Sequence, residues 1–166
     1  MTNAISVKER LKKQALEDGK TMQYKLVTYG LERTIYRLSV SKYAEKFEAF
    51  VSLGLANGRY KDFYDIYVLA DSYDLDGMEL MKAIVETFTH RGTSFNDIAA
   101  FDDDFTKDEI RQGRWRAFIK KKKALVKVEF EETMQLLKEL LLPIVDSIHN
   151  DNSFEQTWSK ETKSWR

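Results

Sequence analysis

The chain lacks cysteine, and its 166 residues include only 1 proline and 7 glycines. Without thiols it can form neither disulfides nor thiolate metal sites, a composition typical of proteins of a reducing cytoplasm. The scarcity of proline and glycine leaves few of the turns that strands and hairpins need. These absences predict a helical protein of the cytoplasm.

An excess of charge and long apolar runs are absent as well. Lys plus Arg equals Asp plus Glu at 27 each, so no overall field attracts nucleic acid or an anionic membrane. No apolar run approaches the roughly 20 residues of a membrane span, and the start MTNAISVKERLKK has no signal-peptide core. We therefore expect no membrane association, and any affinity for nucleic acid must be local.

Apolar residues recur every three or four positions along almost the whole chain, as in the stripes from Tyr24 to Leu38 and from Phe130 to Ile148. This spacing predicts an all-α helical bundle. Capping boxes, in which a Ser, Thr or Asp stands three residues before a Glu, support it at Ser6, Asp76 and Thr106. We expect an N-terminal helical hairpin over residues 1–41, a C-terminal helical domain over 42–166, and a polar tail that docks through its tryptophans. The helices are expected at about 5–17, 20–39, 42–55, 60–72, 77–90, 94–100, 106–123 and 128–149.

Two charged signatures, each leading into an apolar helical run, distinguish the stretch from Ala44 to Ala70. The first is Ala-Glu-Lys at residues 44–46, and the second is Arg-Tyr-Lys-Asp-Phe-Tyr-Asp at 59–65. The Asn57-Gly58 pair between them readily takes positive φ, which predicts a helix–turn–helix hairpin broken there. Together these motifs resemble the distal half of the AbiEii/AbiGii toxin family, nucleotidyltransferases of bacterial toxin–antitoxin and abortive-infection systems.

The resemblance covers two blocks of the chain, residues 5–41 and 44–166. Between such blocks the family carries a mixed α/β core, which opens with a glycine-rich turn and a serine, followed by an Asp-x-Asp pair that holds the catalytic metal. Here Ser41–Tyr43 runs straight into the first signature. The resemblance therefore implies an internal deletion, and a truncated toxin that lacks the metal-binding core and is not catalytic alone.

The two signatures contain the candidate site. In the family pattern the lysine that Lys46 matches lies near the nucleotide phosphates, and a compact ammonium neutralises a phosphate without bidentate geometry. Asp62 and Asp65 are three residues apart on one helix face, so they can position a cation or accept a proton together. Arg59 and Lys61 match the same element and are candidates for binding phosphate. The alternative is an ion network in which these acids simply pair with the neighbouring bases.

No replacement for the family's metal site stands out in the sequence. Asp102–Asp104 contains an Asp-x-Asp, but no Gly-Ser turn precedes it, and a helix dipole alone favours acids before a helix. The run from Asp74 resembles a calcium loop but has Ala83 where a bidentate Glu is required. His90 and His149 are expected at the surface or at helix ends. We expect no metal and no cofactor, with Mg²⁺ and an NTP needed only if another chain supplies the core.

One segment, between residues 111 and 123, has the composition of a local nucleic-acid site. On a helix its charges would form a cationic face for phosphates, with aromatic rings interleaved. Known substrates in the family include tRNA ends, so the resemblance makes RNA contact relevant. The alternative is a solvated helix whose aromatic residues pack in the core. The candidate RNA-binding residues are Arg111, Arg114, Trp115, Arg116, Lys120, Lys121, Lys122 and Lys123.

Three functions remain open: a truncated toxin that binds protein or RNA, a nucleotidyltransferase whose core is supplied in trans, and an RNA-binding helical module. The expected partners are a cognate antitoxin, tRNA or another RNA, and a second copy of the chain. Loss of the core would uncover apolar surface, and monomers rarely expose more than a few hundred Å² of it. We therefore predict a homodimer, with the helices of 5–39 at its interface. The residues expected in the uncovered patch are Phe47, Phe50, Val51, Phe63 and Tyr67.

Overall fold

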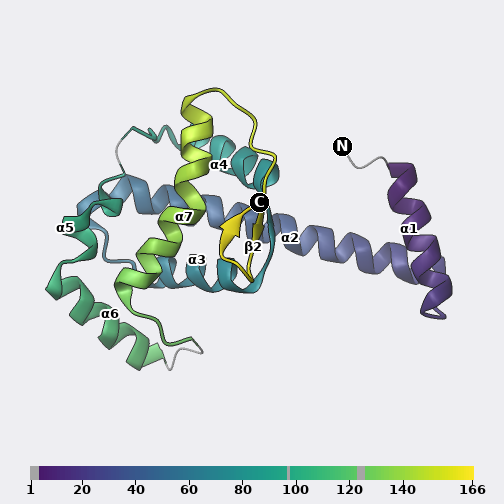
Figure 1. Ribbon diagram of the computed structural model, residues 1–166, viewed down its shortest axis with the longest axis horizontal. Helices are drawn as coiled ribbons and strands as arrows, with labels where there is room; N and C mark the ends of the chain where they lie inside the picture. The colour runs from purple at the N-terminus through teal and green to yellow at the C-terminus, as the bar shows by residue number, and fades with distance from the viewer. Residues whose placement is uncertain (1–3, 97, 123–125) are drawn as a thin grey trace. The chain divides into compact units, whose positions relative to one another are not determined.

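The computed structural model describes residues 4–96, 98–122 and 126–166, and the chain falls into two units, Met1–Ser39 and Val40–Arg166. Seven α-helices make up most of the described chain (Figure 1), which confirms the predicted helical fold class. They are α1 (Ala4–Glu17), α2 (Met22–Leu53), α3 (Tyr60–Ser72), α4 (Gly77–Arg91), α5 (Asp103–Thr106), α6 (Glu109–Lys122) and α7 (Phe130–His149). None of the described helices is long and apolar enough to cross a membrane.

The first unit consists of α1 and the first part of α2, which a turn at Gly19 connects. Gly19 has φ +61°, a left-handed conformation that glycine adopts without steric cost. Asp18 in this turn forms an ion pair with Lys25 of α2. On α1, Leu11 and Ala15 lie one helical turn apart and are buried. The unit is a helical hairpin.

Residues 22–53 form one uninterrupted helix that crosses from the first unit into the second. The prediction of two helices, 20–39 and 42–55, with a connection at Ser41–Tyr43, was therefore wrong. Residues 39–43 contain neither proline nor glycine, so nothing in the segment interrupts a helix. The predicted break rested on the expected deletion junction and had no helix-breaking residue behind it.

Aromatic rings from three helices form the core of the second unit. Phe50 of α2 meets Phe63 of α3 edge to face, with ring centroids 5.3 Å apart, and Phe63 also packs against Phe130 of α7 at 5.9 Å. Around these rings α7 contacts α3, α4 and α6 (Figure 1). The prediction of an uncovered apolar patch is therefore wrong, because packing within this unit buries the residues concerned. Its residues Phe47, Phe50, Val51, Phe63 and Tyr67 are all buried.

The break between α2 and α3 falls where it was predicted, but Gly54 makes the turn and the Asn-Gly pair does not. Gly54 has φ +48° and opens a short 3-10 helix, η1 (Gly54–Ala56). Asn57 has φ −67° and ψ 114°, which is extended backbone, and it is buried. Its side-chain oxygen accepts a hydrogen bond from the Arg59 backbone N–H at 2.8 Å. A side-chain hydrogen bond therefore takes the place of the predicted positive φ.

A small antiparallel sheet joins the start of α4 to the C-terminal tail. Its strands, in order, are β1 (Leu75–Asp76), β2 (Thr157–Ser159) and β3 (Ser164–Trp165). The expectation of an entirely helical chain missed them, because strands this short show no alternation of apolar residues. Trp158 is fully buried and donates its indole N–H to the Ala70 carbonyl at 2.9 Å, and Trp165 donates to Leu140 at 3.1 Å. The tail docks through its tryptophans, as predicted.

The segment between α4 and α6 differs from the prediction. The expected helix over 94–100 is wrong, since its described residues before Ala99 are not helical and a 3-10 turn, η2 (Ala99–Phe101), follows. Next, α6 begins at Glu109, three residues later than expected. Asp108 caps it by accepting the backbone N–H of Arg111 at 2.7 Å. The wrong start came from assigning the cap of this helix to Thr106.

Candidate functional site

Lys46 of α2 reaches two carboxylates of α3. Its Nζ donates to Asp62 Oδ1 at 2.7 Å and to Asp65 Oδ2 at 3.0 Å. The three side chains are between 18% and 23% exposed. Asp62 and Asp65 stand about one turn apart and both face Lys46, as their spacing indicated. The structure thus brings together the three residues that the sequence proposed as catalytic.

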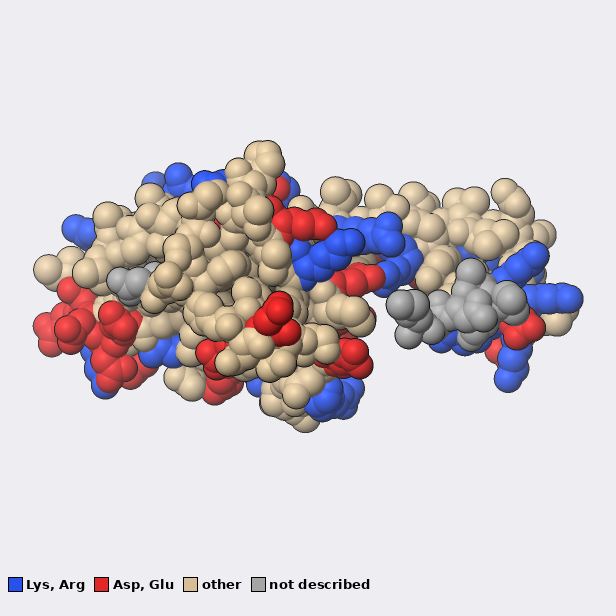
Figure 2. All heavy atoms as spheres, turned by 90° about the horizontal axis from the view of Figure 1, so that it is seen from above, with Lys and Arg blue, Asp and Glu red and all other residues tan. Residues whose placement is uncertain are grey.

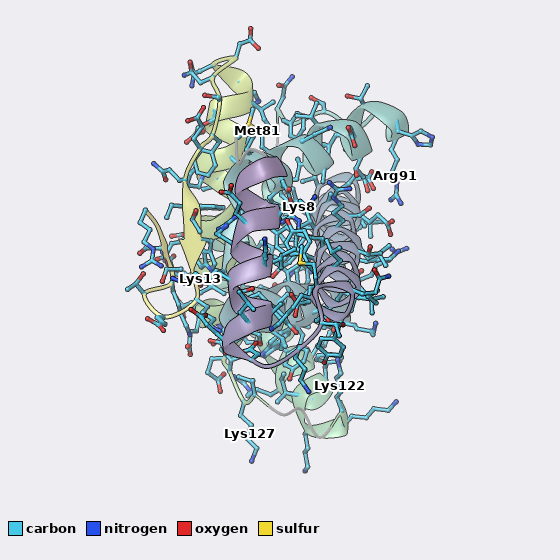
Figure 3. All side chains as sticks on the ribbon, turned by 90° about the vertical axis from the view of Figure 1, so that its right-hand side faces the viewer. Lys8, Lys13, Met81, Arg91, Lys122 and Lys127 are labelled. Carbon is cyan, nitrogen blue, oxygen red and sulfur yellow. The ribbon has the colours of Figure 1, made fainter. Side chains whose placement is uncertain are left out.

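Two further lysines contact Asp65. Lys61, one turn before it on α3, lies 3.2 Å from Asp65 Oδ2. Lys122, at the end of α6 (labelled in Figure 3), lies 3.4 Å from Asp65 Oδ1, and its ammonium is 4.4 Å from the centroid of the Tyr64 ring. The sequence indicated Lys122 only as a candidate RNA-binding residue, because no sequence pattern links it to an aspartate 57 residues away. We call Lys46, Lys61, Asp62, Asp65 and Lys122 the lysine–aspartate cluster.

Charges within the cluster shift the pKa values of two of its groups. Partial burial alone would raise the pKa of Asp65, but hydrogen bonds from Lys46 and Lys61 and the charges of Lys46 and Lys122 lower it below its ordinary value. Burial acts to lower the pKa of Lys46, but bonds and charges from Asp62 and Asp65 raise it above its ordinary value. Both groups are therefore charged at neutral pH. Three ammonium groups facing two carboxylates leave one formal positive charge in excess.

Arg59, the remaining candidate from the second signature, stands at the N-cap position of α3. Its backbone takes part in the turn described above, and its side chain is exposed. The guanidinium is therefore accessible to an anionic ligand near the helix that carries the two aspartates.

Trp115, the aromatic candidate for RNA binding in the α6 segment, is unavailable for stacking on a base. Trp115 is fully buried and donates its indole N–H to the Val128 carbonyl at 2.7 Å. Its ring belongs to the core, as the alternative interpretation of this segment held. Lys123 lies outside the described residues. The basic residues that remain exposed on α6 include Arg114, Arg116, Lys120 and Lys121.

Arg111, at the other end of this segment, braces the turn between α2 and α3. Its guanidinium donates to the carbonyl oxygens of Leu55 and of Asn57, the latter at 3.0 Å. The same guanidinium lies 4.1 Å from the centroid of the Phe105 ring. Through these contacts Arg111 stabilises the turn before α3, the helix that carries Asp62 and Asp65.

Glu48 is a buried charged residue that the sequence interpretation missed. It is 4% exposed, and its carboxylate accepts hydrogen bonds from Arg91 at the end of α4 (labelled in Figure 3) and from the Thr93 hydroxyl. Its position four residues after Ala44 and three before Val51, both buried, is a core position of the helix. A glutamate at a core position of a helix needs a buried partner, so the sequence alone could have indicated an ion pair here.

The other acidic and histidine residues considered for metal lie elsewhere in the fold. Asp103 pairs with Lys107 at 2.7 Å and with Lys138 at 3.9 Å. His90 and His149 are exposed in the last turns of α4 and α7, as predicted. Among the residues that the structure describes, no group of three or more His, Cys, Asp or Glu side chains could hold a metal ion.

The chain belongs to the AbiEii nucleotidyl transferase toxin family. The family model for the nucleotidyl transferase AbiEii toxin of type IV toxin–antitoxin systems matches residues 39–136, which is more than half of the chain. The matched region contains the whole lysine–aspartate cluster and α6. Neither a curated protein nor a solved structure matches the chain.

The lysine–aspartate cluster does not fit the cation that the spacing of Asp62 and Asp65 allowed these carboxylates to position. Asp62 and Asp65 are two carboxylates, and the Lys46 ammonium lies within hydrogen-bonding distance of both. Lys61 and Lys122 add two more ammonium groups beside Asp65. Like charges repel strongly at such separations, so a divalent cation is disfavoured here. The cluster is suited to an anionic ligand.

Proposed function

We propose that this chain supplies the phosphate-binding half of a nucleotidyltransferase site and does not transfer nucleotides by itself. The observation that carries the proposal is the Lys46 ammonium, held 2.7 Å from Asp62 and 3.0 Å from Asp65. Because the two carboxylates already fix this side chain, less conformational entropy is lost when a ligand binds to it. The excess positive charge of the cluster suits the phosphates of an NTP.

Within this half-site the lysines bind phosphate and the aspartates position them. Lys46 is 18% exposed, so its attraction for a phosphate is screened less than on an open surface. Lys61 and Lys122 are 68% and 35% exposed and can turn toward a ligand. A carboxylate with a lowered pKa is a weak proton acceptor at neutral pH. We therefore assign Asp65 to orienting the lysines and not to accepting a proton.

Transfer itself requires groups beyond this half-site. Attack on the α-phosphorus forms one P–O bond and breaks the bond to the departing pyrophosphate, and carboxylate-held metal ions usually neutralise the charge that develops. The family's Gly-Ser turn and Asp-x-Asp pair do not precede Ala44 in this sequence. We attribute this to an internal deletion at Ser41–Tyr43. The basis for this attribution is that Ser41–Tyr43 leads directly into the Ala-Glu-Lys signature, with no core sequence between them.

Incubation of the purified chain with each labelled NTP, Mg²⁺ and RNA or protein acceptors tests this proposal. We expect no incorporation of label. Incorporation that Lys46→Ala or Asp62→Asn abolishes would show that the chain is a complete enzyme. Incorporation that appears only when a second polypeptide from the same locus is added would instead favour a core supplied in trans.

Two macromolecular partners belong to the proposal. Membership of a toxin–antitoxin family indicates a cognate antitoxin. RNA is the second, because exposed Arg116 and Lys120 line a groove of about 610 Å³ between α6 and the start of α7. Glu129 and Glu132 line the same groove and offset part of this charge. Any RNA contact would therefore be electrostatic and salt-sensitive.

We also propose that the chain forms a homodimer through its first unit. The sequence predicted this association from a patch that proves to be buried, but large apolar residues do remain exposed on the first part of α2. Burial of such residues against a second copy would remove them from water, which drives most protein association. Light scattering should then give about twice the chain mass of 19.5 kDa.

A further inference from the structure

The first part of α2 carries a stripe of large apolar side chains that are between 53% and 66% exposed. From residue 24 to residue 38 the steps between them are three, four, four and three positions, a spacing that places all of them on one face of a helix. In Figure 2 this part of α2 (right) has an edge drawn mainly in tan, the colour of uncharged residues. The stripe consists of Tyr24, Val27, Leu31, Ile35 and Leu38.

The spacing of the stripe is the same in both directions from Leu31. In an antiparallel pair of α2 helices with Leu31 opposite its own copy, Val27 faces Ile35 and Tyr24 faces Leu38 of the other chain. A two-fold interface needs such a self-complementary patch, because each contact occurs twice with the partners exchanged. A parallel coiled coil needs steps of three and four in alternation, and the two consecutive steps of four break that pattern. The stripe therefore favours an antiparallel partner of identical sequence.

The polar residues beside the stripe are compatible with the same pairing. Thr28 and Thr34 flank it and would face each other across the two-fold axis. Thr28 donates its hydroxyl to the Tyr24 carbonyl at 3.0 Å, and Thr34 donates to the Gly30 carbonyl at 2.8 Å. Both hydroxyls are satisfied within their own helix, so their burial leaves no unpaired donor. The charged residues of this stretch are Lys25, Glu32, Arg33 and Arg37, and helical spacing places all four off the face of the stripe, so like charges do not meet there.

We propose that a second copy of this chain docks on the stripe, antiparallel, with the two-fold axis at Leu31. If each of the five side chains hides roughly 100 Å², the pair buries about 1,000 Å² in total, near the lower limit of specific interfaces. We therefore expect a reversible dimer with a dissociation constant in the micromolar range. This inference gives a geometry to the proposed homodimer and rests on it, but it is independent of the phosphate-binding half-site.

The absence of cysteine allows a direct test, because any introduced thiol is then unique. Disulfides form only where the two Cα atoms approach within about 7 Å. Under mild oxidation, Leu31→Cys should form a disulfide-linked dimer with itself. Val27→Cys alone should stay monomeric on a non-reducing gel, but should cross-link when mixed with Ile35→Cys. The control Leu26→Cys, exposed on another face of the same helix, should not cross-link.

Each alternative gives a different pattern of cross-links. Self-linking at Val27 as strongly as at Leu31 would indicate a parallel pair and overturn the proposed axis. A dimer mass by light scattering without cross-linking at Leu31 would place the interface elsewhere. A monomer mass at micromolar concentrations would overturn both the axis and the homodimer. Leu31→Asp should abolish the dimer and leave NTP binding unchanged, so failure of the interface and failure of the half-site are distinguishable.

Discussion

Replacement of Lys46 by alanine should lower the free energy of unfolding of the second unit by about 2–3 kcal/mol. Lys46 donates two charged hydrogen bonds, to Asp62 and to Asp65. One such bond contributes about 1.5–3 kcal/mol. Removal of one partner from a fully buried ion pair costs about 3–5 kcal/mol, since the other charge is left unpaired.

Two features of the cluster keep the expected loss near that of one charged hydrogen bond and below that of a fully buried ion pair. The three side chains are between 18% and 23% exposed, so water screens part of the interaction. Lys61 and Lys122 still neutralise Asp65 when Lys46 is removed, whereas Asp62 loses its short bond to an ammonium. The higher helix propensity of alanine returns only about 0.3 kcal/mol.

Lys42→Ala is the matched control for this variant. Lys42 lies one turn earlier on α2, and its pair with Glu45 is exposed, with side chains 61% and 37% accessible. Exposed pairs contribute about 0.2–1 kcal/mol, so this substitution should be nearly neutral. Urea unfolding followed by tryptophan fluorescence reports on the second unit, because all 3 tryptophans lie in it. Equal losses for Lys46→Ala and Lys42→Ala would refute the view that the Lys46 bridge is a fixed, stabilising element.

Three further predictions follow from single contacts. Gly77→Ala should lower the free energy of unfolding, measured in urea, by about 1–3 kcal/mol, because the new Cβ would lie 2.6 Å from the Gln156 carbonyl oxygen. The control Gly113→Ala has open space around its Cβ and should raise the free energy of unfolding by up to about 1 kcal/mol. Folding lowers the pKa of Asp65, so its stabilising contribution is complete above the unfolded pKa and disappears as the pH falls through the folded pKa. The difference in unfolding free energy between wild type and Asp65→Asn should therefore vanish in strong acid. A difference that stays constant with pH would contradict this. If RNA binds α6, Lys120→Ala should reduce the salt dependence of binding to single strands by roughly 0.7 per lost phosphate contact, measured by filter binding, and an unchanged slope would exclude that contact.

The sequence predicted most of the helices because their apolar periodicity and caps agree. The predicted helix over 60–72 has the bounds of α3, Tyr60–Ser72. Asp76 caps α4 by accepting the Glu79 backbone N–H at 2.9 Å, as the capping box indicated. The segment 94–100 failed because short apolar runs also occur in irregular segments that pack on a core, where periodicity carries little information.

The contacts that cross between distant segments could not be predicted from spacing. The pairing of Lys46 with Asp62 and Asp65 followed from the family resemblance, which placed both signatures in one site. The contact of Lys122 with Asp65 depends on how α6 packs in three dimensions, and a run of lysines looks the same whether or not one member is engaged. Similarly, a tryptophan among basic residues indicates stacking on bases and core packing equally well, and only the fold shows that Trp115 is buried.

The binding of labelled ATP, measured by equilibrium dialysis at low salt, tests most directly the claim that the lysine–aspartate cluster binds nucleotide phosphates. We expect saturable binding to the wild-type chain that Lys46→Ala weakens at least tenfold, equivalent to about 1.4 kcal/mol, and that Lys42→Ala leaves unchanged. Release of the bound ATP by pyrophosphate would confirm that phosphates are recognised. Equal binding by the wild type, Lys46→Ala and Lys42→Ala, or binding by none of them, would contradict the assignment of Lys46 to a phosphate-binding half-site.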